Sequence, residues 1–524
     1  MSLQSGDLVE VTAEAVAQGG WCVSRPPGDR VVFVRHALPG ERVIARVTEV
    51  TSNFARADAV DILDASPDRV EPPCPNARPG GCGGCDWQHA SLPAQRALKA
   101  AVVQEQLHRL AGIDREVTVE PMPEDNPGLG WRTRMQFAVD DDGMAGLRAH
   151  RSHEVIDIGD CPIAHPGIRD LGVPRRRWTG AIAVEAAVAS NPSRAGEPNP
   201  SPADAEARGP AVFAGSPGKG VTGGLPPVPG GGQGGRPPGE AQGLPPVPGG
   251  GQGGRPPGEI QREVIVVSGS RPAEVPDVGA ESVLSRYGRK LAPVRGRSYL
   301  TQWAAGREWR VSAGAFWQVH PAAADTLTAA VLATLEPKPG DSALDLYCGA
   351  GLFAGSLAAA VGPSGTVAGV ESDEAAVRDA RHNLRDFPWA TIHRGDVGAV
   401  LRSGSSRGAG SRSAGSRGGG PRGGGSRDAG SHSAGSRRSR GAALPPARLV
   451  VADPPRSGLD RAVIGYLSAA KSGAERFCYV SCDPATLARD IGLLLERGWT
   501  LEGVRAFDAF PMTHHVECVA WLVR

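Results

Sequence analysis

The sequence predicts a mixed α/β protein with an N-terminal OB-like β-barrel, a central α+β domain and a C-terminal Rossmann-like domain. Two observations lead to this prediction. Residues 1–62 alternate apolar and polar side chains in short runs separated by glycine and proline, as the strands of a small antiparallel barrel do. Residues 343–371 read as a buried strand, a glycine-rich turn, a helix and a second strand, which is how a doubly wound sheet begins.

Length and composition limit the possible classes. A chain of 524 residues is too long for a single core. Its 57 Lys and Arg residues nearly balance its 56 Asp and Glu residues, so any RNA-binding surface must be local. The sequence contains neither an apolar run long enough for a membrane helix nor a signal peptide at its start, and we expect a cytoplasmic protein that acts as a monomer without a membrane partner.

The barrel and the central domain account for the first part of the folded chain. We expect the barrel at 1–62, where basic edge residues suggest nucleic-acid binding, although a simple folding cap is the alternative. The central domain is expected at 63–190 and 261–326. It should contain an amphipathic helix at 93–111 and strands near residues 135–139, 155–158, 263–268 and 309–311.

Two low-complexity inserts interrupt this plan. Residues 191–260 are rich in Pro and Gly and contain a near-duplication, so they offer almost no apolar side chains to bury and should be disordered. Residues 403–440 consist of Ser, Gly and regularly spaced Arg. This second insert either contacts RNA phosphates or is a lengthened surface loop without function.

The C-terminal domain, at 327–524, carries a nucleotide-binding pattern. The turn Asp345–Gly351 follows a buried strand, and the next strand ends in Glu371, where a carboxylate can take ribose hydroxyls. The turn lacks the third glycine of the dinucleotide fingerprint, which favours S-adenosylmethionine over NAD. Asp396, at the end of a third strand, either accepts from an adenine amine or caps a helix.

Two more strands of this domain are followed by polar loops that carry Asp453 and Cys482. The carboxyl ends of strands line the ligand crevice of an open α/β sheet, so both residues should face the cleft that also holds Asp345 and Glu371. A cysteine just past a strand end is placed for nucleophilic attack, although buried cysteines are commonly inert.

Four ordered stretches, 345–353, 453–458, 480–490 and 510–517, together resemble the successive motifs of the RNA uracil-5-methyltransferase family, specifically its iron–sulfur RumA type. The N-terminal barrel resembles a TRAM domain. The match spans the chain outside the two inserts. The resemblance implies a class I methyltransferase domain that uses S-adenosylmethionine and acts on RNA.

The chemistry of methyl transfer to uracil explains why such an enzyme needs a thiol and a carboxylate. Carbon 5 of uracil is too weakly nucleophilic to take a methyl group, so a thiolate first adds to carbon 6, and we expect Cys482 to be this nucleophile. A base must then remove the carbon 5 proton, and Glu517 is the candidate. By family resemblance, Gln318 and Asp453 hold the cofactor methionine or the uracil edge, while Tyr347 and Glu371 contact S-adenosylmethionine. A loop hydrogen bond is the alternative role for Gln318.

A cysteine cluster lies upstream, formed by Cys74, Cys82, Cys85 and Cys161. Four thiolates can hold zinc or a [4Fe–4S] cluster, and spacing alone does not separate the two. The resemblance favours iron–sulfur. The sequence departs from the family pattern at Asp483 and His320, where asparagine is frequent; an ionised Asp483 beside the nucleophile would raise the thiol pKa.

The sequence leaves three alternative functions. The first is formation of 5-methyluridine in 23S ribosomal RNA, because a barrel plus a cysteine cluster is similar to the ribosomal branch of the family. The second keeps the chemistry and makes transfer RNA the substrate. The third is a catalytically silent RNA-binding protein. Because the thiol must reach carbon 6, the target uridine has to leave its stack.

Overall fold

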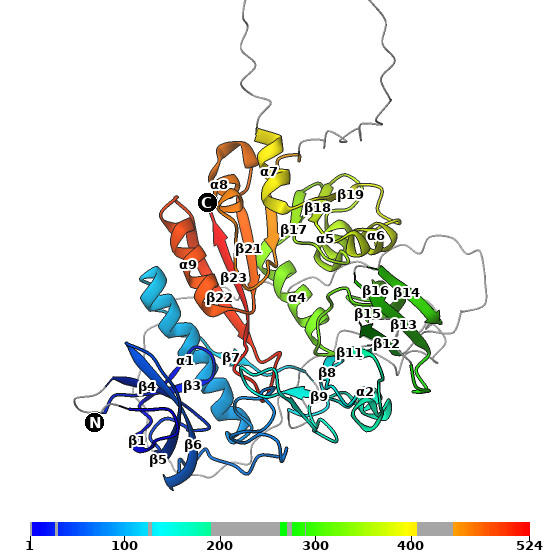
Figure 1. Cartoon of the computed structure of the whole chain (residues 1–524). Helices are drawn as coiled ribbons and strands as arrows, with labels where there is room; N and C mark the ends of the chain where they lie inside the picture. Colours follow the sequence, from blue (N-terminus) through cyan, green and yellow to red (C-terminus); the bar gives the residue numbers. More distant parts are fainter. Residues whose placement is uncertain are drawn as a thin grey trace, which may run out of the picture. The chain divides into compact units, whose positions relative to one another are not determined.

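The computed structural model describes residues 3–26, 30–123, 128–189, 263–269, 275–288, 290–405 and 444–524 (Figure 1). These residues belong to one compact unit that spans Met1–Asn191 and Gln261–Arg524. The first predicted insert, 191–260, and all but the start of the second, 403–440, lie outside the described residues. The described part is a mixed α/β protein with three large sheets and one hairpin.

The N-terminal sheet has six strands in the order β1-β5-β6-β4-β3-β2. Alternate side chains point into a core of small and β-branched residues, as the sequence pattern predicts. The prediction of a purely antiparallel arrangement is wrong, because β4 pairs with β6 in parallel. β6 is long enough to pair along one edge with β5 and along the other with β4. The strands are β1 (Leu8–Thr12), β2 (Ala15–Ala17), β3 (Trp21–Ser24), β4 (Val31–Arg35), β5 (Arg42–Val50) and β6 (Phe54–Asp64).

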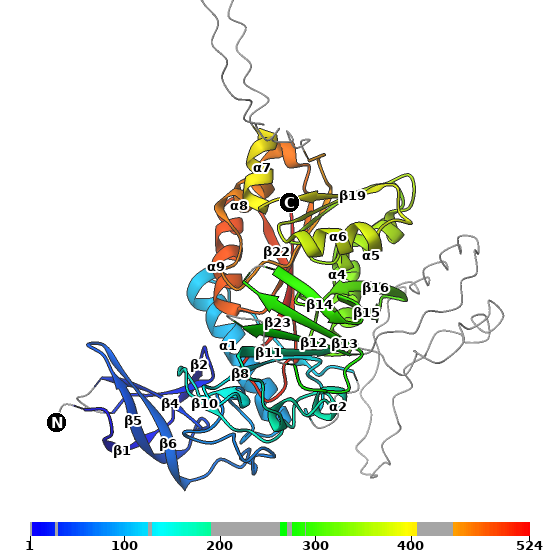
Figure 2. The same cartoon turned by 45° about the vertical axis from the view of Figure 1, so that its right-hand side comes forward.

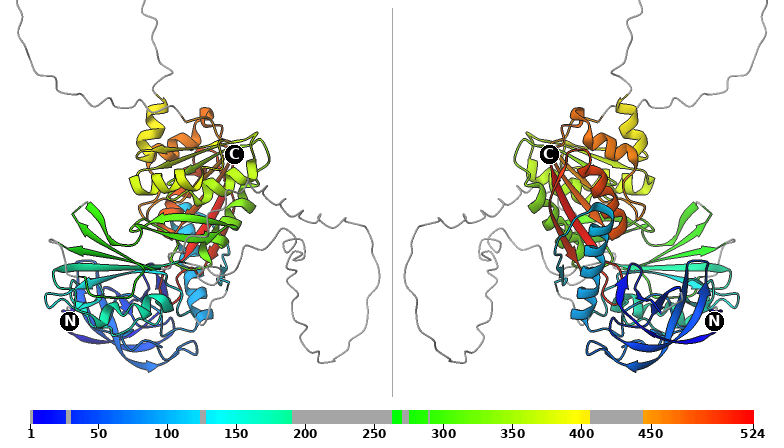
Figure 3. Two further views of the ribbon diagram at one scale, coloured as in Figure 1. Left: turned by 90° about the vertical axis from the view of Figure 1, so that its right-hand side faces the viewer. Right: turned by 90° about the vertical axis from the view of Figure 1, so that its left-hand side faces the viewer.

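Helix α1 (Leu92–Ala111) follows the cysteine-rich segment and confirms the predicted amphipathic helix. Ser91 caps its first turn by accepting a hydrogen bond from the Ala94 amide at 3.4 Å, and Gly112 ends it with φ 65°. The apolar face of α1 packs into the core of the C-terminal domain. In the right-hand view of Figure 3 the light-blue helix α1 accordingly runs beside C-terminal elements drawn in red and orange.

The central sheet has seven strands in the order β10-β9-β8-β11-β12-β13-β14, fanned out in Figure 2. The first insert joins β11 to β12, which are antiparallel neighbours with Val188 paired to Glu263. The insert therefore takes the place of a hairpin loop, where added length costs little stability. The strands are β8 (Arg134–Val139), β9 (Ala145–Arg148), β10 (Val155–Ile156), β11 (Ala181–Val188), β12 (Glu263–Gly269), β13 (Ser282–Tyr287) and β14 (Lys290–Arg295), with helix α2 (Pro166–Asp170) and the hairpin β15 (Tyr299–Ala304) and β16 (Arg307–Ser312).

The C-terminal sheet has eight strands in the order β19-β18-β17-β20-β21-β23-β22-β7. The first five are parallel, while β23 runs antiparallel to both of its neighbours. The last edge strand comes from far upstream in the chain, because β7 pairs with the end of β22. The strands are β17 (Ser342–Leu346), β18 (Thr366–Glu371), β19 (Ala390–Arg394), β20 (Leu449–Ala452), β21 (Arg476–Ser481), β22 (Thr500–Phe507), β23 (Glu517–Val523) and β7 (Val119–Glu120).

Helices cover both faces of this sheet (Figure 1). One face packs against α4 (Ala323–Leu335), α5 (Leu352–Val361) and α6 (Glu374–Asn383). The other packs against α1, α7 (Val397–Ser405), α8 (Arg461–Ser468) and α9 (Pro484–Leu495). Strands buried on both faces read as continuous apolar runs, which is why the sequence predicts them well. Among the described residues, no helix combines the length and apolarity needed to cross a bilayer.

Candidate functional site

The strand order of the C-terminal sheet reverses between β17 and β20, and ligands bind beside such a point in open α/β sheets. The carboxyl ends of β17, β18, β20 and β21 meet there. Tyr347, Glu371, Asp453 and Cys482 follow or end these four strands. The topology thus brings four of the predicted site residues to one edge of the sheet.

The glycine-rich turn after β17 is held by Glu371. Its carboxylate accepts from the Gly349 amide at 3.0 Å and from the Asp373 amide at 2.7 Å. Gly351, with φ 92°, opens α5, and a Cβ there would come within 2.7 Å of the Leu384 side chain. The turn therefore requires glycine at this position, and the acid that ends β18 lies against the loop.

Asp345 lies fully buried on β17 below this turn. One carboxylate oxygen accepts from the Ala354 amide at 2.7 Å, while the other contacts no hydrogen-bond donor in the part of the chain that the structure describes. Burial, together with the nearby carboxylates of Asp453 and Glu371, raises the pKa of Asp345 well above its usual range. One oxygen of this buried carboxyl is thus left without a partner among the described residues.

Cys482 follows β21 directly and is half-buried. Burial raises its thiol pKa to about 12, and the neighbouring carboxylates of Glu517 and Asp453 act in the same direction. Arg456 opposes this effect through its charge and a hydrogen bond to the sulfur. The thiol, two carboxylates and a guanidinium thus form one interacting group.

The two carboxylates in this group hold protons tightly. Glu517, at the start of β23, is only 4% exposed, and burial beside Asp453 raises its pKa well above the usual range. Burial raises the pKa of Asp453 to about 7. A carboxylate with a raised pKa is a stronger base once it is ionised, which is the property that proton abstraction needs.

A pocket of about 60 Å³ opens beside the thiol, and we call it the thiol pocket. Polar side chains from four segments line it, among them Arg456, Cys482, Asp483, His514 and His515, and residues 17–20 of the N-terminal sheet form part of its wall. The N-terminal sheet therefore contributes directly to the surroundings of Cys482.

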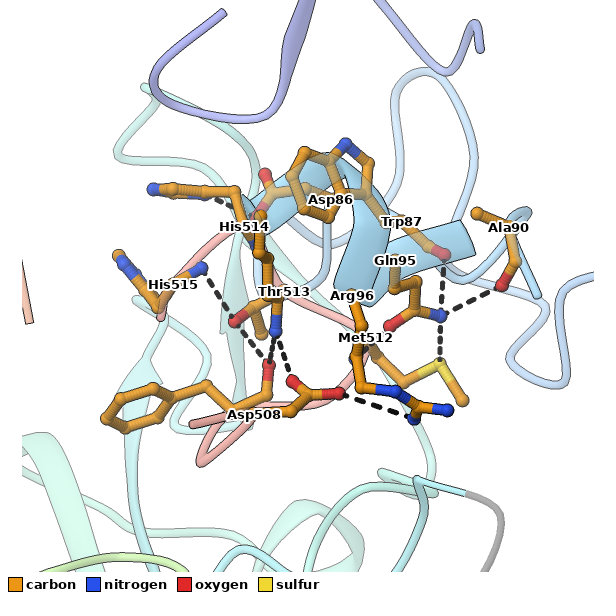
Figure 4. Close-up of polar contacts among 12 residues, drawn as sticks. Asp86, Trp87, Ala90, Gln95, Arg96, Asp508, Met512, Thr513, His514 and His515 are labelled. Atoms are coloured by element: carbon orange, nitrogen blue, oxygen red, sulfur yellow. Dashed lines mark hydrogen bonds and ion pairs between the residues drawn. The ribbon is translucent and has the colours of Figure 1, made fainter. Parts of the chain in front are cut away.

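The loop before β23 supports this pocket through a chain of polar contacts (Figure 4). Asp86 accepts from His514, with 2.6 Å between Oδ2 and Nδ1, and the rings of His514 and His515 lie 4.0 Å apart. His515 Nε2 lies 3.1 Å from Nη2 of Arg456. The residue after Cys85 is thereby linked, through two histidines, to the arginine beside Cys482.

The two departures from the family pattern have local structural roles. Asp483 caps α9 by accepting from the Thr486 amide at 2.9 Å, and it also accepts from Gln18 at 3.1 Å. His320 is buried, accepts from the Ala322 amide at 3.2 Å and stacks against Trp131. In this structure the acids that raise the Cys482 pKa include Glu517 and Asp453.

Two further predicted cofactor residues, Tyr347 and Asp396, follow strands β17 and β19 of the same sheet. Asp396 caps α7 by accepting from the Ala399 amide at 2.8 Å, the structural role that the sequence left open. Burial raises the pKa of Tyr347 to about 12, and Asp396 contributes to this shift, so the two lie near each other. Gln318 is buried in the loop between β16 and α4.

Cys74, Cys82, Cys85 and Cys161 line one cavity of about 200 Å³, which we call the cysteine cavity. All four are free thiols, and burial raises the pKa of Cys161 to about 11. Each of them lies close enough to another to affect its ionisation. As placed within the described ranges, no three of the His, Cys, Asp and Glu side chains form a preassembled metal site.

Comparisons with known proteins agree with this geometry. The TRAM domain model matches residues 3–60, the tRNA (Uracil-5-)-methyltransferase model matches 446–524, and a protein-L-isoaspartate O-methyltransferase model matches 310–398. An uncharacterized RNA methyltransferase of Streptomyces avermitilis is 43% identical over 99% of this chain and 98% of its own length. One of Bifidobacterium longum is 30% identical over 98% and 96%.

The chain belongs to the TrmA/RumA family of RNA uracil-5-methyltransferases. As a TrmA/RumA-family enzyme it uses S-adenosylmethionine, and its N-terminal sheet is a TRAM domain. The fold agrees with a solved structure, the tRNA (uracil-54, C5)-methyltransferase of Pyrococcus abyssi in complex with S-adenosyl-L-homocysteine. That structure is 19% identical, with a TM-score of 0.59, and covers 98% of this chain and 100% of its own.

Sequence reasoning missed several residues of this TrmA/RumA-family site. Arg456 and His514 lie inside motifs that the sequence already marked, and Arg456 follows Asp453 by three residues, so a cation at this position was a usable signal. Asp86 and Gln18 gave no signal, because their roles depend on contacts between segments more than 400 residues apart in the chain.

Proposed function

We propose that this enzyme forms 5-methyluridine in 23S ribosomal RNA through a covalent bond between Cys482 and the target uridine. The observation that carries the proposal is the grouping of Cys482, Glu517 and Arg456 at the edge of the sheet where cofactor-binding loops meet. A thiol, a buried carboxylate and a guanidinium are the groups that this chemistry needs.

Cys482 acts first. Its thiolate adds to carbon 6 of uracil, and the electron pair of the 5,6 double bond becomes available at carbon 5. Arg456 favours the thiolate, because its charge and hydrogen bond offset part of the rise in pKa that burial causes. S-adenosylmethionine supplies the methyl group that carbon 5 takes.

Glu517 acts second. Its carboxylate removes the proton that carbon 5 still carries, the electron pair re-forms the double bond, and the bond from carbon 6 to sulfur breaks. A buried carboxylate with a raised pKa suits this step, because its affinity for a proton is high.

Three of the residues that we propose to bind the cofactor end or follow neighbouring strands of the C-terminal sheet. When S-adenosylmethionine is bound, Glu371 would take the ribose hydroxyls, Tyr347 would contact the cofactor, and Asp396 would accept from the adenine amine. Gln318 and Asp453 hold the methionine part of the cofactor or the uracil edge. Support comes from Glu371 and Tyr347 flanking the glycine turn.

The proposal extends to a [4Fe–4S] cluster in the cysteine cavity. Its support is that four free thiols line one space, with Cys82 and Cys161 close enough to Cys85 to raise its thiol pKa, and thiolates are the ligands that such a cluster needs. Cys74, Cys82, Cys85 and Cys161 would hold the cluster, and zinc is the alternative. When bound, the cluster joins the segment after the TRAM domain to the central sheet, and no step of methyl transfer passes through it.

Transfer RNA is the second candidate substrate. It is favoured by the similarity to the tRNA (uracil-54, C5)-methyltransferase of Pyrococcus abyssi and by the match to the tRNA (Uracil-5-)-methyltransferase family model. In either case we expect a monomer acting in the cytoplasm. A catalytically silent RNA-binding protein is disfavoured by the intact grouping of Cys482, Glu517 and the glycine turn.

Two measurements test the proposal. Intact-protein mass spectrometry after reaction with S-adenosylmethionine and RNA containing 5-fluorouridine should reveal RNA linked to Cys482, because fluorine cannot leave as a proton. Mapping 5-methyluridine in ribosomal and transfer RNA of a deletion strain identifies the substrate. Absence of any linked species in the first measurement would rule out the covalent route.

A further inference from the structure

The turn between β2 and β3 of the TRAM domain lines the thiol pocket. Residues 17–20 form part of its wall together with Arg456, Cys482 and Asp483. Gln18 is the one side chain of this turn that carries a polar amide. A group that occupies the thiol pocket therefore lies beside the turn that carries Gln18.

The cysteine-rich segment fixes the position of this turn. The carbonyl of Gly20 accepts from the Trp87 indole at 3.2 Å. A Cβ on Gly20 would come within 2.9 Å of the Asp86 side chain and 3.1 Å of the His514 side chain, and its φ is 81°. Only glycine fits at this position, so the backbone beside Gln18 is held closely against the catalytic domain.

The orientation of the Gln18 amide follows from its partner. The NH₂ group donates to Oδ2 of Asp483 at 3.1 Å. Because the nitrogen donates to this carboxylate oxygen, the amide oxygen takes the other position. That oxygen is buried and accepts from no group within the described ranges of the chain.

A buried acceptor without a donor costs stability, unless a ligand supplies the donor. Beside the nucleophile, the ligand is the uracil ring, whose ring N–H at position 3 is a donor. Cytosine has an acceptor at the same position, so an acceptor here selects uracil.

We propose that Gln18 is a substrate-positioning residue that the TRAM domain contributes to the thiol pocket, its amide oxygen accepting the ring N–H of the target uracil. This inference rests on the proposed function. The TRAM domain then acts in two ways, because it takes part in selecting the base as well as in holding RNA.

Gln18→Met tests the inference, because methionine keeps the length of the side chain and removes the acceptor. Gln4→Met, at an exposed position of the same domain, is the matched control. In the full-length enzyme, Gln18→Met should raise KM for unmodified total RNA of the deletion strain by about fivefold to tenfold, the worth of one hydrogen bond. KM for S-adenosylmethionine and the rate at which iodoacetamide alkylates Cys482 without RNA should stay unchanged. Gln18→Ala, which cannot overfill the pocket, should behave in the same way.

A second arm identifies the donor. A short RNA around the mapped uridine is prepared with and without a methyl group on ring nitrogen 3, and its Kd is measured with S-adenosyl-L-homocysteine present. The methyl group should weaken binding to the wild type more than binding to Gln18→Met, because the two changes remove the same contact. An equal loss in both proteins overturns the assignment to the target base.

The remaining outcomes are also decisive. If Gln18→Met alters Cys482 alkylation and leaves KM for RNA unchanged, Gln18 only supports Asp483 and the inference is wrong. Failure of the wild type to link to 5-fluorouridine RNA overturns the proposed function. A wild type that links normally beside a Gln18→Met variant with an unchanged KM for RNA overturns this inference alone.

Discussion

The thiol pocket and the cysteine cavity both bury cysteines, but they surround them differently. Burial raises the pKa of Cys482 to about 12 and that of Cys161 to about 11, so the effect of burial on the thiol pKa alone does not distinguish the two sites. Around Cys161 and its three companions the nearest ionisable groups include other thiols. Around Cys482 they are two carboxylates and the guanidinium of Arg456.

This difference shows what each site can do. Several thiolates in one cavity repel one another unless they share a cation, so that arrangement suits a metal or a cluster. A single thiol with a cation on one side and bases on the other can be ionised, attack and leave again. The neighbours of a cysteine therefore indicate its role better than its burial does.

Replacing one cysteine with serine at each of the two sites should give the largest difference between them. Cys482→Ser should lower methyl transfer by roughly 10³-fold or more and abolish the link to 5-fluorouridine RNA, because the nucleophile is lost. Cys85→Ser should lower bound iron and thermal stability, yet leave Cys482 open to alkylation. Metal analysis and intact mass spectrometry measure both. Loss of iron in Cys482→Ser instead would contradict the division of roles.

Glu517→Gln tests the base in the thiol pocket. The amide cannot take the proton from carbon 5, so turnover should fall by about 10²-fold to 10⁴-fold while the methylated adduct accumulates. Gel electrophoresis of enzyme with RNA after a single turnover reveals the adduct. Product release at the wild-type rate would remove Glu517 from this role.

Arg456→Met tests the cation. Because the thiolate is the reactive form, alkylation of Cys482 should rise with pH toward its pKa of about 12. Removing the guanidinium raises that pKa further, so the profile should move to higher pH and the rate at pH 8 should fall by about tenfold, equal to one pKa unit. The exposed Arg461→Met is the control. An unchanged profile would show that Arg456 does not act on the thiol.

Asp345→Asn should give a smaller effect, on stability. The folded state raises the pKa of Asp345, so its contribution is present below the ordinary carboxyl pKa of about 4 and is lost as pH rises through the folded value. The amide escapes this loss while still accepting from the Ala354 amide. Urea unfolding should show the variant more stable than the wild type at pH 8 and equal to it near pH 4. The exposed Asp142→Asn should be neutral at both pH values, and a gain for Asp345→Asn at pH 4 as well would refute this explanation.

Most of the C-terminal fold could be predicted from the sequence, because its strands are buried on both faces and form continuous apolar runs that end in polar loops. The same runs placed Asp453 and Cys482 at one edge. The parallel pairing of β4 with β6 could not be predicted, since alternation fixes which face a side chain takes but not which strand lies alongside. The hydrogen bonds between His514 and Asp86 and between Gln18 and Asp483 could not be predicted either, because they join segments that tertiary packing brings together.

The two-residue strand β7 limits where the chain can be truncated to prepare a catalytic fragment. Val119 and Glu120 pair with the end of β22, and α1 covers the sheet nearby. A fragment that starts after the first insert would lose both, leaving backbone groups of β22 unpaired and apolar surface open to water. An exposed strand edge is a template for pairing with a second copy, so we expect such a fragment to aggregate, and catalytic fragments should keep residues 92–120 alongside the last third of the chain.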